Sequence, residues 1–394
     1  MFYLIPTLFD YVLYGIFFIV GYQLAESGVG ALTASAPMAV WGIVYALSAS
    51  LAGRITTAEN APKLLRLSGW GTALCSLLFI FLSDAWGMLI LVGVMGVVSA
   101  FYCIPFQMCA NSGRQGSTPA RAAGFYTFSW SIGTAAGTFG FGCLPGAAGF
   151  AVNAAIGLLM VILVGKDHAE KKTVEADSGE VLPAGETVPM IPVWIFGAVG
   201  AFCMAAAGAL LPLRGVELKT GVFASGAVLG VLRLVQGIAA LLLIRGNALL
   251  PTPLLLLTGG VCGASGLLCL TLGTNLLWLF SGSVLFGLCG GIFYFSLVFN
   301  ALRNGTKSAA CLGVNEMILG ITGIAGPAAG GMAAQALGIG TAFGGCAVFL
   351  LLGGIAAWMT AAIRNKKDNG ISKKSEALSE TPRKNESGHR ASAD

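Results

Sequence analysis

Three ionisable side chains stand inside long apolar stretches of this sequence: Asp10, Arg233 and Glu316. An ionisable group at the centre of a bilayer-spanning helix costs at least about 2.5–3.5 kcal/mol, so each needs a partner or a wet cavity. A guanidinium at that depth can bind an anion or hold a gate, and a carboxyl group there can bind a coupling proton. Alternatively, Arg233 is structural, bonded to carbonyls and hydroxyls at a helix interface, and Glu316 pairs with Arg233 or Arg54.

Arg233 lies deepest of the three. Its stretch, Gly221–Ile244, extends about twelve residues to one side and eleven to the other, which at about 1.5 Å per residue places it near a bilayer midplane. Glu316 lies roughly seven residues into its stretch, about 10 Å deep, and Asp10 is similarly shallow. We therefore take Arg233 as the candidate cation for binding an anion or holding a gate, and Glu316 and Asp10 as the candidate carboxyl groups for proton coupling.

Aromatic and polar side chains on the same stretches are further candidates for lining a binding cavity. They are Tyr14, Tyr102, Gln107, Tyr126, Ser129, Trp130, Trp194, Tyr294 and Asn300. Each could instead pack between helices or belong to the aromatic belt at a membrane interface.

The sequence contains no recognisable catalytic, cofactor or metal-binding motif. It lacks a G-x-S-x-G elbow, an H-E-x-x-H helix and a P-loop lysine. The ten cysteines show no ligand spacing, and both histidines, His168 and His389, lie in polar segments. We expect no enzyme activity, no cofactor and no metal site.

Composition indicates a membrane protein. The chain is 56% hydrophobic and 10% charged, whereas soluble domains carry roughly 25% charged residues. The 57 glycines sit within apolar runs, where small residues let transmembrane helices approach closely. The net charge of +5 does not indicate a nucleic-acid partner, because the basic residues occupy short loops and residues 364–394, where membrane orientation explains them.

The elements that must position the candidate residues are about twelve apolar stretches, each long enough to cross a bilayer. They are Tyr3–Leu24, Leu32–Ala52, Leu65–Leu82, Trp86–Ala110, Ala120–Gly142, Gly146–Val164, Met190–Leu213, Gly221–Ile244, Leu254–Leu272, Leu276–Leu302, Ala309–Leu337 and Thr341–Ile363. We therefore predict an all-α membrane protein with a six-helix half over residues 1–165, a linker over 166–189 and a second six-helix half over 190–363. Residues 364–394 are rich in Lys, Ser and Glu and lack aromatics, which predicts a disordered tail.

Lys and Arg gather on one side of these predicted helices. That side holds Arg54, Lys63, Arg66, Arg114, Arg121, Lys166, Lys171, Lys172, Arg245, Arg303, Lys307 and the basic residues of the tail, and the other side holds Arg214 and Lys219. Basic loops remain in the cytoplasm. Both termini and the linker are thus expected inside, in a multi-pass protein of a bacterial cytoplasmic membrane.

An internal repeat relates the two halves. Arg114-Gln115-Gly116-Ser117 matches Arg303-Asn304-Gly305-Thr306 at an offset that also pairs Ala136-Gly137 with Ala325-Gly326. The fourth and fifth stretches therefore correspond to the tenth and eleventh. Two parallel six-helix halves joined by a cytoplasmic linker are a known transporter layout.

The chain resembles the major facilitator superfamily over nearly all of residues 3–363. The resemblance rests on Gly124–Gly133 with Gly137 and Gly142, on Gly313–Gly320 with Gly326-Pro327 and Gly331, and on Leu232–Gly237. The family's Gly-rich loop after the second helix is degenerate here. It reads Gly53–Asn60, with Thr57 where an aspartate is expected.

The resemblance implies a secondary transporter of a small organic solute that works by alternating access, with the first, fourth, seventh and tenth helices lining a central cavity. Transport of this kind is either coupled to a proton gradient or uncoupled, as in a facilitator. The resemblance is also compatible with an exporter of amphipathic compounds and with a non-transporting membrane sensor on the same fold. The expected partners are the solute, the lipid bilayer and, if transport is coupled, protons. We expect a monomer.

The orientation can be tested by cysteine labelling. A cysteine introduced as Ser178→Cys in the linker should resist an impermeant thiol reagent in intact cells, because the linker's lysines place it in the cytoplasm. A cysteine in the Leu213–Thr220 loop should be labelled, and the native cysteines are controlled for with the parent protein. Equal labelling of the two sites would contradict the assignment.

Overall fold

The computed structural model describes residues 4–57, 59–82, 84–111, 118–167, 190–245, 253–304 and 307–379. The side chains of 107–111, 165–167, 309 and 365–379 lie outside this description. The described residues form twelve helices and no strand. The helices are α1 (Leu4–Glu26), α2 (Ala31–Ile55), α3 (Ala61–Phe81), α4 (Ala85–Asn111), α5 (Pro119–Cys143), α6 (Ala147–Asp167), α7 (Met190–Glu217), α8 (Val222–Arg245), α9 (Pro253–Leu272), α10 (Leu276–Arg303), α11 (Ser308–Leu337) and α12 (Ile339–Ser379).

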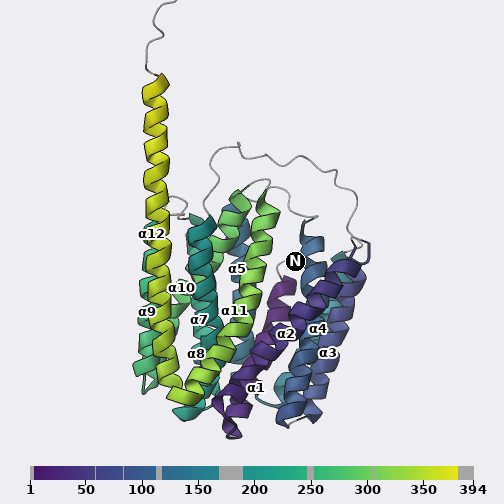
Figure 1. Ribbon diagram of the computed structural model, residues 1–394. Coiled ribbons are helices and arrows are strands. Elements are labelled where there is room, and N and C mark those ends of the chain that lie inside the picture. Colours follow the sequence, from purple (N-terminus) through teal and green to yellow (C-terminus); the bar gives the residue numbers. More distant parts are fainter. Residues whose placement is uncertain are drawn as a thin grey trace, which may run out of the picture.

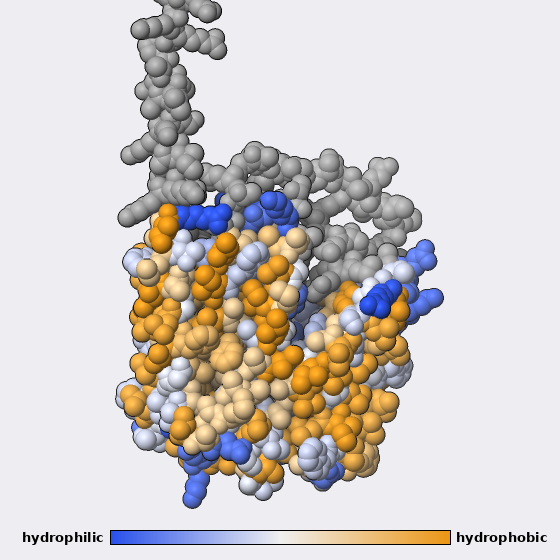
Figure 2. Space-filling model, viewed as in Figure 1, coloured by the Kyte–Doolittle hydropathy of each residue, from blue (hydrophilic) through white to orange (hydrophobic). Residues whose placement is uncertain are grey.

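The predicted fold class is confirmed. Eleven of these helices are long and apolar enough to cross a membrane. On one face of the molecule an apolar surface lies between two hydrophilic ends (Figure 2), as a bilayer requires. The helix outside that set is α5, whose hydroxyl side chains Thr127, Ser131, Thr134 and Thr138 are fully buried. Neighbouring helices shield α5, so its polar residues do not meet lipid.

The helices pack with the same pattern in both halves. Within the first half, α1 packs on α5, α2 on α4, and α3 on α6. Within the second half, α7 packs on α11, α8 on α10, and α9 on α12 (Figure 1). Each contact in the first half recurs in the second half between the helices numbered six higher, so that α5 corresponds to α11. This correspondence is the one that the sequence repeat indicates.

Two ends of the bundle differ in charge. The basic end carries Arg54, Lys63, Arg121, Arg245 and Arg303, each near an end of its helix. The start of α1 lies at the same end of the bundle. The far end is the opposite one, where α1 ends, α2 begins and Arg214 lies near the end of α7. Because the basic end holds most of the described Lys and Arg residues, it is the end that the sequence assigns to the cytoplasm.

At the basic end, α12 continues to Ser379 and projects beyond the bundle (Figure 1). The sequence analysis expected disorder from Arg364 onward, whereas residues 364–379 are helical. Lys, Glu, Ala and Leu in this stretch have favourable helix propensities, and extending an existing helix avoids the cost of nucleation. Residues 380–394, and residues 168–189 of the expected linker, lie outside the described residues.

Glycines allow α5 to lie directly against α1. A Cβ added to Gly133 or Gly137 would collide with the backbone of Thr7 or Tyr11, respectively. The Thr7 hydroxyl donates a hydrogen bond to the Ser129 carbonyl across the same contact, at 2.9 Å. The close packing of α1 on α5 thus depends on the absence of side chains at Gly133 and Gly137.

Replacing Gly137 by alanine should destabilise the protein. The new methyl group would overlap the Tyr11 carbonyl, and overpacking of this kind typically costs about 1–3 kcal/mol. The matched control is Gly345→Ala on α12, where an added Cβ meets nothing within 4 Å. The measurement is the apparent melting temperature in detergent by size-exclusion chromatography. Equal melting temperatures for the two variants would refute the close contact.

Candidate functional site

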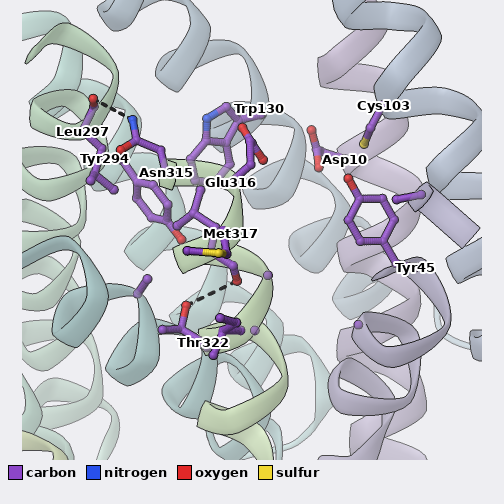
Figure 3. Close-up of a pocket in the computed structure, with 18 of the residues that line it drawn as sticks. Asp10, Tyr45, Cys103, Trp130, Tyr294, Leu297, Asn315, Glu316, Met317 and Thr322 are labelled. Carbon is purple, nitrogen blue, oxygen red and sulfur yellow. Dashed lines mark hydrogen bonds between the residues drawn. The ribbon is translucent and has the colours of Figure 1, made fainter. Parts of the chain in front are cut away.

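A cavity of about 520 Å³ lies between the two halves. Side chains from α1, α2, α4 and α5 line one side of it, and side chains from α7, α8, α10 and α11 line the other. The close-up in Figure 3 shows Asp10, Tyr45 and Cys103 on one wall and Tyr294 and Glu316 on the other, with Trp130 of α5 beside Tyr294 and Glu316. The volume is in the range of pockets that enclose small organic ligands, roughly 300–1,000 Å³.

Arg233 is held in place from several directions. Its side chain lines the cavity although only 2% of the residue's surface is exposed. One terminal nitrogen, Nη1, donates to Gln236 Oε1 at 3.1 Å, and the guanidinium carbon lies 5.2 Å from the centre of the Tyr14 ring. The Tyr294 hydroxyl also hydrogen-bonds with the guanidinium. The charge is therefore placed by a cation–π contact and by uncharged hydrogen-bond acceptors.

Gln236 connects Arg233 to the other half of the protein. Its Nε2 donates to the Ser131 hydroxyl of α5 at 2.8 Å, and the Gln236 side chain is fully buried. The sequence analysis named Tyr126 and Ser129 among the candidate residues on α5, but Ser131 provides the bond, through Gln236. A displacement of α8 relative to α5 would break this bond or carry Arg233 with it.

The two carboxyl groups of the cavity lie on opposite halves. Asp10 belongs to α1, and Glu316 belongs to α11, and Figure 3 shows them on facing walls. Among the described residues, the ion pair within 4.0 Å is Arg214 with Glu217, so Arg233 contacts neither carboxylate directly. Asp10 interacts electrostatically with Arg233. The expected pair of Glu316 with Arg233 or Arg54 is not formed in this state.

Aromatic rings make up much of the remaining wall. Trp130 and Tyr294 meet edge to face with ring centres 4.7 Å apart, and Trp41 and Tyr45 stack at 5.0 Å. Tyr102 stacks on Phe9 at 3.8 Å. Such paired rings give a rigid, largely apolar surface for a ligand.

Of the residues predicted for the site, eight line the cavity. They are Asp10, Tyr14, Tyr102, Tyr126, Trp130, Arg233, Tyr294 and Glu316. Three others lie elsewhere. The Ser129 hydroxyl donates to the Tyr126 carbonyl, Trp194 Nε1 donates to Asn315 Oδ1 at 3.0 Å, and Asn300 Nδ2 donates to the Ser296 carbonyl. The Gln107 side chain lies outside the described residues.

The sequence analysis missed Trp41, Tyr45, Cys103 and Asn315 as cavity residues. Trp41 and Tyr45 are four residues apart, the helical spacing that places two side chains on one face. The Cys103 thiol hydrogen-bonds with Tyr45. Asn315 also donates from Nδ2 to the Leu297 carbonyl at 2.8 Å (Figure 3), so with Trp194 it ties α11 to α7 and α10. The position of Asn315 directly before Glu316 was the sequence signal that could have identified it.

The cavity is closed at the far end by contacts between α2 and α11. Gln335 Oε1 accepts a hydrogen bond from the backbone N–H of Leu32 at 3.2 Å, which caps α2 from the opposite half. The Ser35 hydroxyl donates to the Pro327 carbonyl at 3.2 Å. Nearer the basic end, Tyr45 and Ala49 of α2 and Glu316 of α11 line the cavity. In Figure 1, α2 and α11 diverge toward the basic end.

Comparison with solved structures shows the same fold in transporters. The human organic anion transporter MFSD10 (TETRAN) matches with a TM-score of 0.65 and 13% identity, over 90% of this chain and 98% of that one. The nucleoside transporter NupG matches with a TM-score of 0.65 and 11% identity, over 91% and 98%. A POT family transporter in complex with a thioalcohol-conjugated peptide matches with a TM-score of 0.69 and 12% identity, over 92% and 95%.

Sequence comparison assigns the family. A search of curated proteins gave no match. The sequence pattern of the Major Facilitator Superfamily matches residues 2–310, which is most of the chain. This range contains all of the cavity-lining helices except α11, of which it contains only the start. With twelve helices among its described residues, in two similarly packed halves around a central cavity, this chain belongs to the Major Facilitator Superfamily.

Proposed function

We propose that the protein is a secondary transporter that moves a small organic solute across the membrane by alternating access. The observation that carries this proposal is the cavity between the halves, which contains three ionisable side chains at membrane depth. Such groups are costly in a bilayer and mark substrate or ion pathways. Transporters of this layout bind their substrates near the midplane, between their two repeats.

Because α2 and α11 diverge toward the basic end (Figure 1), we take the cavity to be accessible from that end. The far end is closed by the Gln335–Leu32 and Ser35–Pro327 hydrogen bonds. If the basic end is cytoplasmic, this is the inward-facing state. The outward-facing state then requires these two bonds to break and the parts of α2 and α11 nearer the basic end to come into contact.

Asp10 and Glu316 are the proposed sites of proton coupling. They lie on different halves and face the same cavity as Arg233. Neither carboxyl group forms an ion pair within 4.0 Å with any of the residues that the structure describes. A carboxyl group can enter a low-dielectric site as the neutral acid, whereas a guanidinium stays charged, so the carboxyls are the groups that can carry a proton.

Reconstitution tests transport and coupling together. A panel of small organic solutes is screened for those that raise the melting temperature, since a ligand of the native state stabilises it. The most stabilising solutes are then assayed for uptake into proteoliposomes with an imposed proton gradient. We expect uptake above that of protein-free liposomes, and loss of accumulation when the gradient collapses. Asp10→Asn or Glu316→Gln should also abolish accumulation.

The matched control for these variants is Glu26→Gln, which alters an exposed carboxylate at the far end. Accumulation that survives collapse of the gradient would exclude proton coupling and favour a facilitator. Absence of flux for every stabilising solute would exclude transport and favour the sensor.

Substitution of Arg233 should abolish transport without preventing membrane insertion. Arg233→Ala removes the charge and its bonds to Gln236 and Tyr294, and flux should fall to the protein-free background. Arg233→Lys should lower flux at least about tenfold, because an ammonium lacks the planar fork and loss of a charged hydrogen bond costs about 1.5–3 kcal/mol. The measurement is uptake at matched protein level in the membrane.

The control for Arg233 is Arg245→Ala, an exposed arginine at the end of the same helix. It should retain normal flux. Normal flux in Arg233→Ala would make Arg233 a dispensable structural residue.

A further inference from the structure

The two lateral seams between the halves differ. Along the seam of α5 with α8, close contacts extend from end to end. At the far end, Gly142 lies against Phe223; toward the middle, Gly230 lies against Ala135; and near the basic end, Gly124 lies against Ala240. The seam of α2 with α11 is packed only toward the far end. Its packed part ends at Gly42, where an added Cβ would lie 2.8 Å from Ile324 Cγ1.

Beyond Ile324, the part of α11 nearer the basic end has open space beside it. Gly320 and Gly323 line the cavity, and Cβ atoms added to them meet nothing within 4 Å. Met317 and Ile321 line the cavity and are nevertheless 58% and 59% exposed. Exposure of this degree in cavity-lining side chains fits an opening between α2 and α11, which diverge over this stretch (Figure 1).

This opening lies at the depth of the hydrocarbon core. Gly320 is twelve residues from the start of α11 at Ser308, which corresponds to about 18 Å along the helix. The opening is bordered by Ala46, Met317 and Ile321, so a solute dissolved in the bilayer would meet apolar side chains there. A strongly hydrated solute would not choose this route.

Inside the cavity, Arg233 is the one cationic side chain among the described residues that line it. Its buried Nε has no hydrogen-bond partner, and no carboxylate of the described residues lies within 4.0 Å. Asp10 and Glu316 can lose their charge by binding a proton, but the guanidinium cannot lose its charge. The cavity therefore keeps a permanent positive charge at Arg233 that no carboxylate of the described residues contacts, and an anionic ligand would neutralise it.

The surroundings of Arg233 favour an aromatic body on that anion. Tyr14 covers the guanidinium, and the edge-to-face pair of Trp130 and Tyr294 is next to it in the same cavity. Flat rings pack well on such walls. A carboxylate or sulfonate at Arg233 would leave the aromatic part of the molecule against these rings.

We propose that the cavity takes an amphipathic aromatic organic anion, which binds Arg233 and enters from the bilayer through the opening between α2 and α11. This inference deepens the proposed function and names the substrate class and entrance of the same site. It differs from that proposal in being testable by binding alone, without any measurement of flux.

The substrate class is tested with three probes that share one aromatic body. They are 1-pyrenebutyrate, 1-pyrenebutanol and 1-pyrenebutylamine, whose head groups are anionic, neutral and cationic. Binding to the protein in lipid nanodiscs is followed by energy transfer from tryptophan to pyrene, with empty nanodiscs as the control for partitioning. We expect the anion to bind at least about tenfold more tightly than the alcohol, and 4-phenylbutyrate to displace it.

Two Arg233 variants separate charge from structure. Arg233→Gln should remove the preference for the anion, and Arg233→Lys should retain that preference at lower affinity, because the charge remains. Equal affinity for anion and alcohol in the unmodified protein would overturn the substrate class. Tighter binding of the amine would overturn it in favour of a cation held by Asp10 and Glu316.

The entrance is tested by obstruction. Gly320→Trp and, as a second variant, Gly323→Trp should slow association and dissociation of 1-pyrenebutyrate several-fold and in similar proportion. Gly345→Trp on α12, also in open space, should leave both rates unchanged. Unaltered rates in both obstructed variants would overturn entry between α2 and α11.

Failure of this inference and failure of the proposed function give different results. Uptake of another solute by a protein that binds no pyrenebutyrate would overturn the inference alone. Selective pyrenebutyrate binding by a protein that transports nothing would overturn the function and leave the site.

Discussion

The permanent charge of Arg233 is the constraint on which the rest of the site depends. A guanidinium that is 2% exposed cannot shed its proton, so the protein must surround it with acceptors or an aromatic face. Tyr14, Gln236 and Tyr294 do this, and no carboxylate in the described part of the chain contacts the guanidinium. Gln236 in turn bonds Ser131, so satisfying one charge also connects the two halves.

The same connection explains why the seam of α5 with α8 differs from the seam of α2 with α11. The Gln236–Ser131 bond and a row of glycines keep α5 and α8 in contact along their length. The α2 and α11 pair is joined by two hydrogen bonds near the far end. Net hydrogen-bond contributions are only about 0.5–1.5 kcal/mol each. Because its packed part ends at Gly42, the seam of α2 with α11 is the one that we expect to open and close during a transport cycle.

The fold and much of the site could be predicted from the sequence because a bilayer imposes long apolar segments and makes each charge within them conspicuous. Arg233, Asp10 and Glu316 stood out for this reason, and all three line the cavity. Partners could not be predicted, because Gln236 and Ser131 are unremarkable until helix packing brings them together. Trp194 and Asn300 do not line the cavity, because a polar side chain on the right helix can still face a neighbour. The helical extension of α12 could not be predicted from composition, because it depends on a helix continuing from the turns that precede it.

The central claim is that the seam between α2 and α11 alternates between two arrangements, and it is tested most directly by distance measurements in nanodiscs. Spin labels at Ser27 and Leu337 report the far end, and labels at Ser50 and Gly313 report the basic end. In Gln335→Ala, which loses the cap on Leu32, we predict a longer far-end distance and a shorter basic-end distance than in the parent protein. Unchanged distributions at both ends would contradict alternating access at this seam.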